Sequence, residues 1–184
     1  MPLNRNIGGY ITANPVAPSS TLATGVWTLS QQLQAVSAGL WPVPPQQFIA
    51  VAHSLTPFIT AYPWNGSGFG TKFANPATLP IGTGNGVAFS PAGGAIAMAH
   101  AGTPFVSAYP WSGSGFGTKF SNPATRPTGT GNGVAFSPSG DAIAVAHLTT
   151  PFVSAYPWSG SGFGGKFSNP ATLPPNNGYG VAFS

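Results

Sequence analysis

A unit of 47 residues recurs along this chain and constrains its fold more than any other feature. The segments PFITAYPWNGSGFGTKF, PFVSAYPWSGSGFGTKF and PFVSAYPWSGSGFGGKF begin at Pro57, Pro104 and Pro151, so the step is 47 residues both times. Close copies at a step of this length are typical of solenoids, propellers and other repeat architectures. The repeat therefore indicates a repeat architecture, whatever the role of any single residue.

Each unit contains short apolar runs with a period of two, which is typical of β-strands. GVAFS at 133–137 and AIAVAH at 142–147 flank a Pro-Ser-Gly turn and predict a hairpin. PFVSAYPW at 151–158 is the expected third strand, and GKFSN at 165–169 the expected fourth. Four short antiparallel strands in about 40–50 residues fit one blade of a β-propeller. The expected fold class is all-β, with propeller-type four-stranded repeats.

Small and large side chains alternate along the second strand of the unit. Ile143, Val145 and His147 share one face, and alanines occupy the other. In a propeller, both faces of such a strand are buried between neighbouring blades. A small face against a large face lets identical blades nest at the density of a protein interior.

The hairpin sequence VAFSPSGDAIAVAH at 134–147 resembles the first hairpin of a WD-repeat-type blade, whose usual form runs V-x-F-S-P-x-G before a second apolar strand. AYPW stands where the Trp-Asp ending of that repeat would fall. Together with GVWTLSQQLQAVSAGLWP at 25–42, the repeats also resemble tailed-phage virion proteins. That resemblance implies a structural component of a phage virion, capsid-associated or in a tail or fibre, and a virion or extracellular localisation.

The chain divides into three expected parts: an arm with a short helix at 1–42, a stiff linker at 43–47 and the repeat region at 48–184. Thr28 and Gln31 match a capping box and predict the start of a helix within 27–42. A helix this short is marginal in water and needs a surface to lie on. The arm and helix are therefore expected to attach the protein to a larger assembly. Its expected contact residues are Trp27, Leu29, Leu33, Val36, Leu40 and Trp41.

The repeat region begins and ends out of register with the unit. It opens with FIAVAH at 48–53, a second strand, and ends with GVAFS at 180–184, a first strand, giving three blade-equivalents. Propellers typically have four to eight blades. Two chains could exchange final strands in a six-bladed dimer, head-to-tail donation could build a filament, or the sequence could belong to a longer protein. Val181 and Phe183 are the candidate assembly residues if the strand is donated.

Composition argues against several classes of function. Only 3% of residues are charged, against about 25% in ordinary domains. The five Lys and Arg residues are scattered, which excludes a nucleic-acid footprint. No apolar run reaches the ~18 residues of a membrane helix. The single acid, Asp141, lies in a hairpin turn, so acid/base chemistry with paired carboxylates is not expected. We expect no enzyme activity, catalytic residue or cofactor.

Three histidines keep the repeat step: His53, His100 and His147. Rotational symmetry could bring them around one axis as metal ligands. Each shares a strand face with apolar residues, however, which favours a structural histidine that bonds a backbone carbonyl. No metal site is predicted.

Two aromatic residues recur in each YPW segment and allow two interpretations. Buried, they would pack between blades; exposed at a rim, they could stack on sugars of a cell-surface glycan. The residues are Tyr62, Trp64, Tyr109, Trp111, Tyr156 and Trp158. The expected partners are other virion proteins or copies of the chain itself, with glycan recognition or an extracellular filament as alternatives.

Overall fold

The computed structural model describes residues 28–38 and 46–184. The chain divides into two units, residues 1–45 and residues 46–184. The described part of the first unit is one short helix, and the second unit is all β. Most of the predicted linker at 43–47 lies outside the described residues. No described helix is both long and apolar enough to cross a bilayer.

Helix α1 spans Leu29–Ser37 and starts at the predicted capping box. The Thr28 hydroxyl accepts a hydrogen bond from the Gln31 amide, and the Gln31 side-chain oxygen accepts one from the Thr28 amide at 2.9 Å. These bonds satisfy donors that the first turn leaves without an intrahelical partner. Ala38 is the C-cap, so the helix lies within the 27–42 segment that the sequence indicated.

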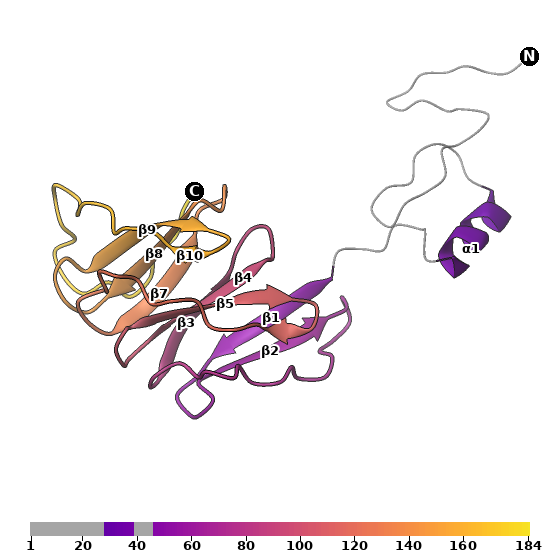
Figure 1. Ribbon diagram of the computed structural model, residues 1–184, viewed down its shortest axis with the longest axis horizontal. Helices are drawn as coiled ribbons and strands as arrows, with labels where there is room; N and C mark the ends of the chain where they lie inside the picture. Colours follow the sequence, from indigo (N-terminus) through magenta and orange to yellow (C-terminus); the bar gives the residue numbers. More distant parts are fainter. Residues whose placement is uncertain (1–27, 39–45) are drawn as a thin grey trace, which may run out of the picture. The chain divides into compact units, whose positions relative to one another are not determined.

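The second unit consists of ten strands in three antiparallel sheets (Figure 1). The first sheet pairs β1 with β2, the second has the order β3-β4-β5-β6, and the third has the order β7-β8-β9-β10. We call these sheets blades 1, 2 and 3. Their strands are β1 Gln47–Ala52, β2 Ile59–Trp64, β3 Gly84–Phe89, β4 Ala95–His100, β5 Val106–Ser112, β6 Gly115–Phe116, β7 Gly131–Phe136, β8 Ala142–His147, β9 Val153–Ser159 and β10 Gly162–Phe163.

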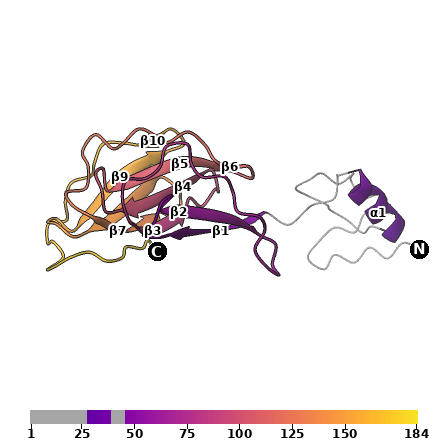
Figure 2. The same cartoon turned by 90° about the horizontal axis from the view of Figure 1, so that it is seen from below.

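The blades follow one another in chain order, as Figures 1 and 2 show from two directions. Blade 1 lies at one end of the array and blade 3 at the other. The hairpin predicted from 133–137 and 142–147 is β7 paired with β8, with Val134 opposite Val145. The prediction of propeller-type, four-stranded antiparallel repeats is thus confirmed.

Packing between blades follows the alternation of side-chain size. The large face of blade 2 carries Ile96, Met98, Tyr109 and Trp111, and the large faces of the other blades carry the residues at the equivalent repeat positions. The small face of each blade carries its alanines. The large face of blade 2 packs on the small face of blade 1, around Ile59 and Ala61. The large face of blade 3 packs in the same way on the alanines of blade 2. Full burial of each large side chain contributes about 1.5–3 kcal/mol.

The first strands of successive blades also bond to each other. The Asn85 side-chain amide donates to the carbonyl of Gly131 at 2.8 Å, and Asn132 donates to Gly178 at 2.8 Å. The amide of Gly178 donates to the His147 carbonyl at 3.0 Å. Residues 178–183 therefore follow the path of a first strand on blade 3. They pair with no second strand of their own among the described residues.

Two strand predictions were wrong in their limits. The third strand begins at Val153, not at 151, because Phe152 has a φ of 68° that an extended strand does not adopt. The fourth strand is Gly162–Phe163 rather than 165–169. Gly162 has a φ of 120°, which lets the chain reverse tightly after Ser159, so pairing resumes at once. Phe167 adds only a backbone bond to Ala155, at 2.9 Å.

We predict that Gly131→Ala destabilises the repeat region. A Cβ at this position would overlap the carbonyl oxygen of Phe105 and lie 3.2 Å from the Cβ of Ala99, both in the preceding blade. Overpacking of this kind lowers the free energy of unfolding by about 1–3 kcal/mol. Gly165→Ala is the matched control, because no atom lies within 4 Å of its added Cβ. Urea unfolding of both variants measures the difference; equal midpoints would contradict the close approach of the blades.

Candidate functional site

The six aromatic residues of the YPW segments occupy two environments. Four are buried between blades: Tyr109, Trp111, Tyr156 and Trp158. Tyr62 and Trp64, in blade 1, are half-buried. The buried four present no free ring face to a sugar, and their arrangement is inter-blade packing. Only the blade 1 pair keeps a surface that a ligand or a partner could reach.

Each buried tryptophan sits in a cage of phenylalanine rings. The Trp111 ring lies 5.0–5.2 Å, centroid to centroid, from the rings of Phe73, Phe89 and Phe116. Trp158 has the equivalent neighbours one repeat later, Phe120, Phe136 and Phe163, at 5.1–5.3 Å. Most of these pairs meet edge to face, a geometry worth about 0.5–1.5 kcal/mol each beyond area burial.

The phenylalanines of these cages were not singled out from the sequence. They recur at the repeat step in the segments GVAFS, GFG and KF, and that periodicity was the available signal. What the sequence hides is that one cage draws rings from two blades. Phe73 precedes blade 2 in the chain and packs on Trp111 within it.

The large face of blade 1 is open. Ile49, Tyr62 and Trp64 are half-buried and Val51 is 44% exposed, although their counterparts in blades 2 and 3 are buried. Trp64 has one ring neighbour among the described residues, Phe69 at 5.3 Å. The edge of β1 that does not bond β2 carries no other strand in the described part of the chain. This open face and strand edge form the candidate site.

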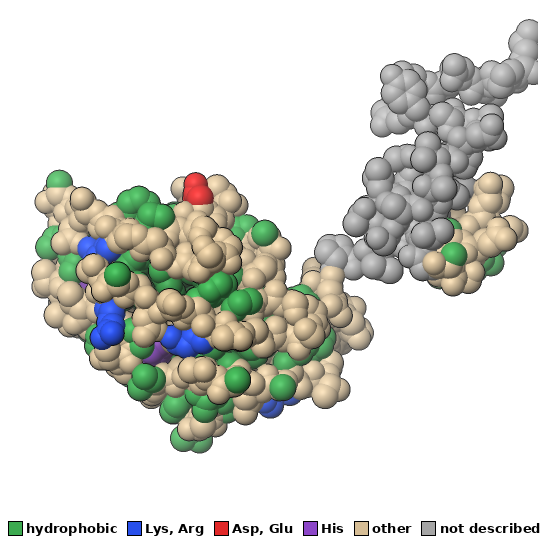
Figure 3. Space-filling view, viewed as in Figure 1, with side chains coloured by type: hydrophobic (Ala, Val, Ile, Leu, Met, Phe, Trp, Pro, Cys, Tyr) green, Lys and Arg blue, Asp and Glu red, His purple; other side chains and the backbone are tan. Residues whose placement is uncertain are grey.

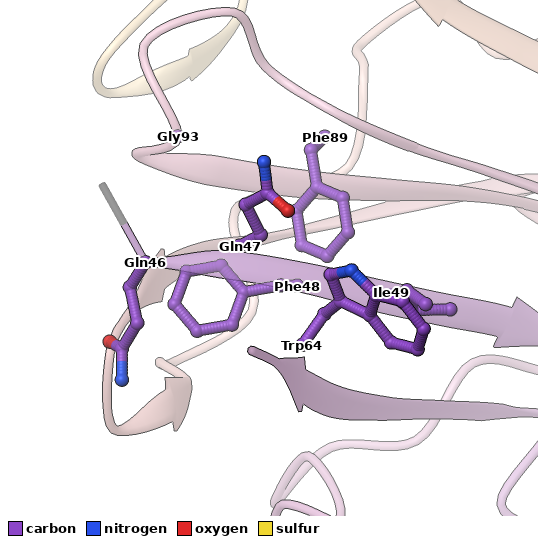
Figure 4. Close-up of a pocket in the computed structure, with 7 residues that line it drawn as sticks. All are labelled: Gln46, Gln47, Phe48, Ile49, Trp64, Phe89 and Gly93. Carbon is purple, nitrogen blue, oxygen red and sulfur yellow. The ribbon is translucent and has the colours of Figure 1, made fainter. Parts of the chain in front are cut away.

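A cavity of about 440 Å³ lies beside this face (Figure 4). Phe48, Ile49, Trp64 and Phe89 supply its apolar lining, and the amides of Gln46 and Gln47 are polar groups at its wall. Phe48 also packs on Trp111, with centroids 5.3 Å apart. In the other blades an alanine stands at the position of Phe48. Phe48 therefore gives this cavity a lining ring that has no counterpart in blades 2 and 3.

His100 is a structural histidine in the described repeat region. Its Nδ1 lies 3.0 Å from the Ile81 carbonyl oxygen, and its Nε2 lies 2.9 Å from the Ser107 hydroxyl. A carbonyl only accepts, so Nδ1 carries the proton and Nε2 accepts from Ser107. His147 Nε2 likewise lies 3.1 Å from Ser154. No group of three His, Cys, Asp or Glu residues suited to a metal occurs in the described residues.

Burial lowers the pKa of His100 to about 4, because the charged imidazolium would lose its hydration. Backbone hydrogen bonds oppose this change, and the nearby Lys119 charge adds to it. Burial also lowers the pKa of His147. Both side chains are therefore neutral at neutral pH and contribute packing and hydrogen bonds rather than charge.

Charged side chains are sparse on the face shown in Figure 3, where blue and red groups are few. The only carboxylate side chain, Asp141, accepts hydrogen bonds from Ser139 at 2.6 Å and Ser137 at 2.8 Å. These bonds lower the pKa of Asp141. Its partners belong to the β7–β8 turn, so the carboxylate serves turn structure, as the sequence suggested.

The predicted assembly residues fall in both units. In α1, Leu29, Leu33 and Val36 are exposed. Near the end of the chain, Val181 is half-buried and Phe183 is 38% exposed. Three of the predicted contact residues lie outside the described residues: Trp27, Leu40 and Trp41.

Comparison with solved structures supports a fold built from propeller-type blades. The chain is similar to the crystal structure of a candidate 6-phosphogluconolactonase from Bacteroides fragilis NCTC 9343, with a TM-score of 0.56 and 11% identity. The match covers 78% of this chain and 44% of that one, so this chain spans less than half of that protein. At this identity the likeness concerns the fold alone. No protein-family model and no curated protein matches the chain.

We predict that the repeat region loses stability as pH falls from about 6.5 towards 4. The unfolded chain binds a proton at His100 with a pKa near 6.5, whereas the folded chain binds one only near 4. Within this window the unfolded state holds more protons, so the free energy of unfolding rises with pH, by up to about 1.4 kcal/mol per pH unit for one histidine. Asp141 stays ionised there, because its pKa is lowered.

Urea unfolding at pH 7 and at pH 5 measures the dependence. His100→Gln removes one titrating group and is expected to flatten it. A stability that stays constant or rises on acidification would contradict the assignment of His100 as a buried neutral group.

Proposed function

We propose that this protein is a non-enzymatic structural protein whose repeat region assembles through the open ends of its blade array. The observation that carries the proposal is the open large face of blade 1. The same face is buried in blade 2 and in blade 3, where a small face covers it. A surface built by repetition to fit a neighbouring blade has no such neighbour among the described residues.

The energetics favour an association that includes strand pairing. Burial of Ile49, Val51 and Trp64 would contribute about 1.5–3 kcal/mol for each side chain that becomes fully buried. Association costs about 4–15 kcal/mol in lost freedom of motion. Hydrogen bonds along the free edge of β1 would add about 0.5–1.5 kcal/mol each. Pairing of this edge would also remove an exposed strand edge, which is a site of non-specific aggregation. Face and edge together can offset the cost where the face alone falls short.

The first unit supplies the proposed means of attachment to a larger assembly. Leu29, Leu33 and Val36 are exposed along a helix of nine residues. A helix of this length needs a surface to be stable. Following the sequence resemblance, we place that assembly in the virion of a tailed phage, as a capsid-associated or tail and fibre component. Loss of incorporation on deletion of residues 1–42, with the repeats still folded, is the test of this role.

The side-chain inventory supports a role without catalysis. The whole sequence has one carboxylate side chain, so it has no pair of carboxylates that could act as general acid and general base. His100 and His147 are buried, and the pKa of each is lowered. The activity named for the similar propeller belongs to that protein.

We predict that the full chain associates in solution and that Val51→Lys weakens the association about tenfold or more. Val51 lies on the open face, and a buried lysine charge without a partner would cost more than the 1.4 kcal/mol that this factor represents. Ile81→Lys, an equal change at an exposed site outside the open face, is the control. Sedimentation velocity measures both. A chain that remains monomeric at tens of micromolar would overturn the proposed function.

A second candidate function is glycan recognition at the cavity beside Trp64. A half-buried indole next to two amides, from Gln46 and Gln47, offers the ring face and the polar groups that a sugar needs. On a glycan array, we expect Trp64→Ala to abolish binding and Leu55→Ala, an exposed loop residue that does not line the cavity, to keep it. No binding by the unaltered chain, or binding kept by Trp64→Ala, would contradict this candidate.

A further inference from the structure

We infer that the partner that completes blade 1 is a second copy of this chain, which donates residues 178–183 to β1 and packs Phe167 and Phe183 on Trp64. This inference rests on the proposed function and names the partner at the open face. It follows from three features that the repeats share: the aromatic cages, the path of the first strands and the strand register.

The aromatic cage of blade 1 lacks two of its three rings. Trp111 and Trp158 each contact three phenylalanine rings. The first ring follows the tight turn after the tryptophan, the second comes from the first strand of the same blade, and the third comes from the preceding blade. Trp64 has only the first of these, Phe69. The two missing rings of the Trp64 cage are therefore a phenylalanine from a first strand and a phenylalanine from the end of a preceding blade.

The end of the repeat region carries both missing rings. Phe89 and Phe136 are the first-strand rings, and the residue one repeat further along is Phe183. Phe73 and Phe120 are the rings from the preceding blade, and the residue one repeat further along is Phe167. Phe167 is 48% exposed and Phe183 is 38% exposed. The chain thus presents two unpaired phenylalanines on blade 3 and an incomplete cage on blade 1.

The backbone of residues 178–183 already lies in the position of a first strand. The Gly178 amide bonds the His147 carbonyl at 3.0 Å, as the Gly84 amide bonds the His53 carbonyl at 3.0 Å. An added Cβ at Gly133 would approach the Cα of Gly180, as one at Gly86 would approach the Cα of Gly133. The segment therefore repeats the contacts of β3 and β7 with the preceding blade. No second strand of a blade pairs with this segment among the described residues. Conversely, β1 occupies the position of a second strand, and no first strand pairs with it in the described part of the chain.

The register of this junction follows from the two complete blades. Val87 pairs with Met98 and Val134 pairs with Val145, which places Val181 opposite Val51 of the second copy. Phe89 pairs with Ile96 and Phe136 pairs with Ile143, which places Phe183 opposite Ile49. Because Phe89 and Phe136 contact Trp111 and Trp158, Phe183 in this register would contact Trp64.

The donor segment and its acceptor edge belong to different copies. Blades 1 and 3 are at opposite ends of the array, with blade 2 between them (Figure 1). Two copies of three blades, each closed by the other's strand, give six blades, which is within the usual range of four to eight. The contact at each junction would then be the same small-on-large packing that joins the blades within one chain.

One residue at the junction departs from the repeat. Asn85 and Asn132 each donate a side-chain hydrogen bond to the next blade, and Tyr179 stands at the equivalent position. In the donated strand this position faces Gly84 of the second copy, and Tyr179 is 74% exposed. Tyr179→Asn would restore the missing bond. One net hydrogen bond of about 0.5–1.5 kcal/mol corresponds to an association about two- to tenfold tighter.

Cross-linking between full-length chains tests the inference, because the sequence has no cysteine. One preparation carries Val181→Cys and the other Val51→Cys, and the two are mixed and treated with a short thiol-reactive cross-linker. Opposed residues in antiparallel strands have Cβ atoms about 4.5–5.5 Å apart, within its reach. We expect linked dimers of one chain of each kind, at least tenfold more abundant than with Leu55→Cys in place of Val51→Cys. Leu55 is an exposed loop residue outside the pairing.

The outcomes separate this inference from the proposed function. Chains that associate in sedimentation but do not link Val181 to Val51 would overturn the second-copy register and leave assembly standing. A chain with both cysteines that links only within itself would overturn it too, as would a Tyr179→Asn chain with unchanged association. A monomeric unaltered chain would overturn both proposals. Tighter association of the Tyr179→Asn chain would support the inference independently of the folding of any cysteine variant, and the mixed dimer would support the register directly.

Discussion

Packing of a large face on a small face is the interaction on which the rest of this structure depends. The alanines of one blade leave room for the isoleucine, methionine or valine, tyrosine and tryptophan of the next. Because charged residues make up only 3% of the sequence, ion pairs have little part in holding the blades together. The Phe–Trp cages lie at the same interfaces, where Phe73 and Phe120 of one blade contact Trp111 and Trp158 of the next.

The same interaction explains why the two ends of the described blade array differ. An interface made by repetition has two unlike sides, and an array of such units keeps one of each at its ends unless it closes. Blade 1 presents the large side, with Val51 exposed, and blade 3 presents the small side with residues 178–183 lying along it. In the assembly that we propose, the same blade-to-blade contact would set the geometry of the junction between copies.

Much of the fold could be predicted from the sequence, because the signals are local and repeated. The Pro-Ser-Gly turn between two alternating runs predicts the β7–β8 hairpin, and alanine alternation predicts nested blades. The limits of the third and fourth strands could not be predicted, because they depend on the φ of Phe152 and on the tight reversal at Gly162. The difference in burial between Trp111 and Trp64 could not be predicted either, because the two YPW segments have nearly the same sequence. Only the presence of a neighbouring blade distinguishes them.

An experimental structure of the full chain in its associated form would show what completes blade 1. We predict an unbroken series of small-on-large contacts, in which a strand from another copy lies along β1 and two phenylalanine rings from that copy complete the cage of Trp64. A structure in which the free edge of β1 stays open, or is covered by residues 1–45 of the same chain, would contradict it.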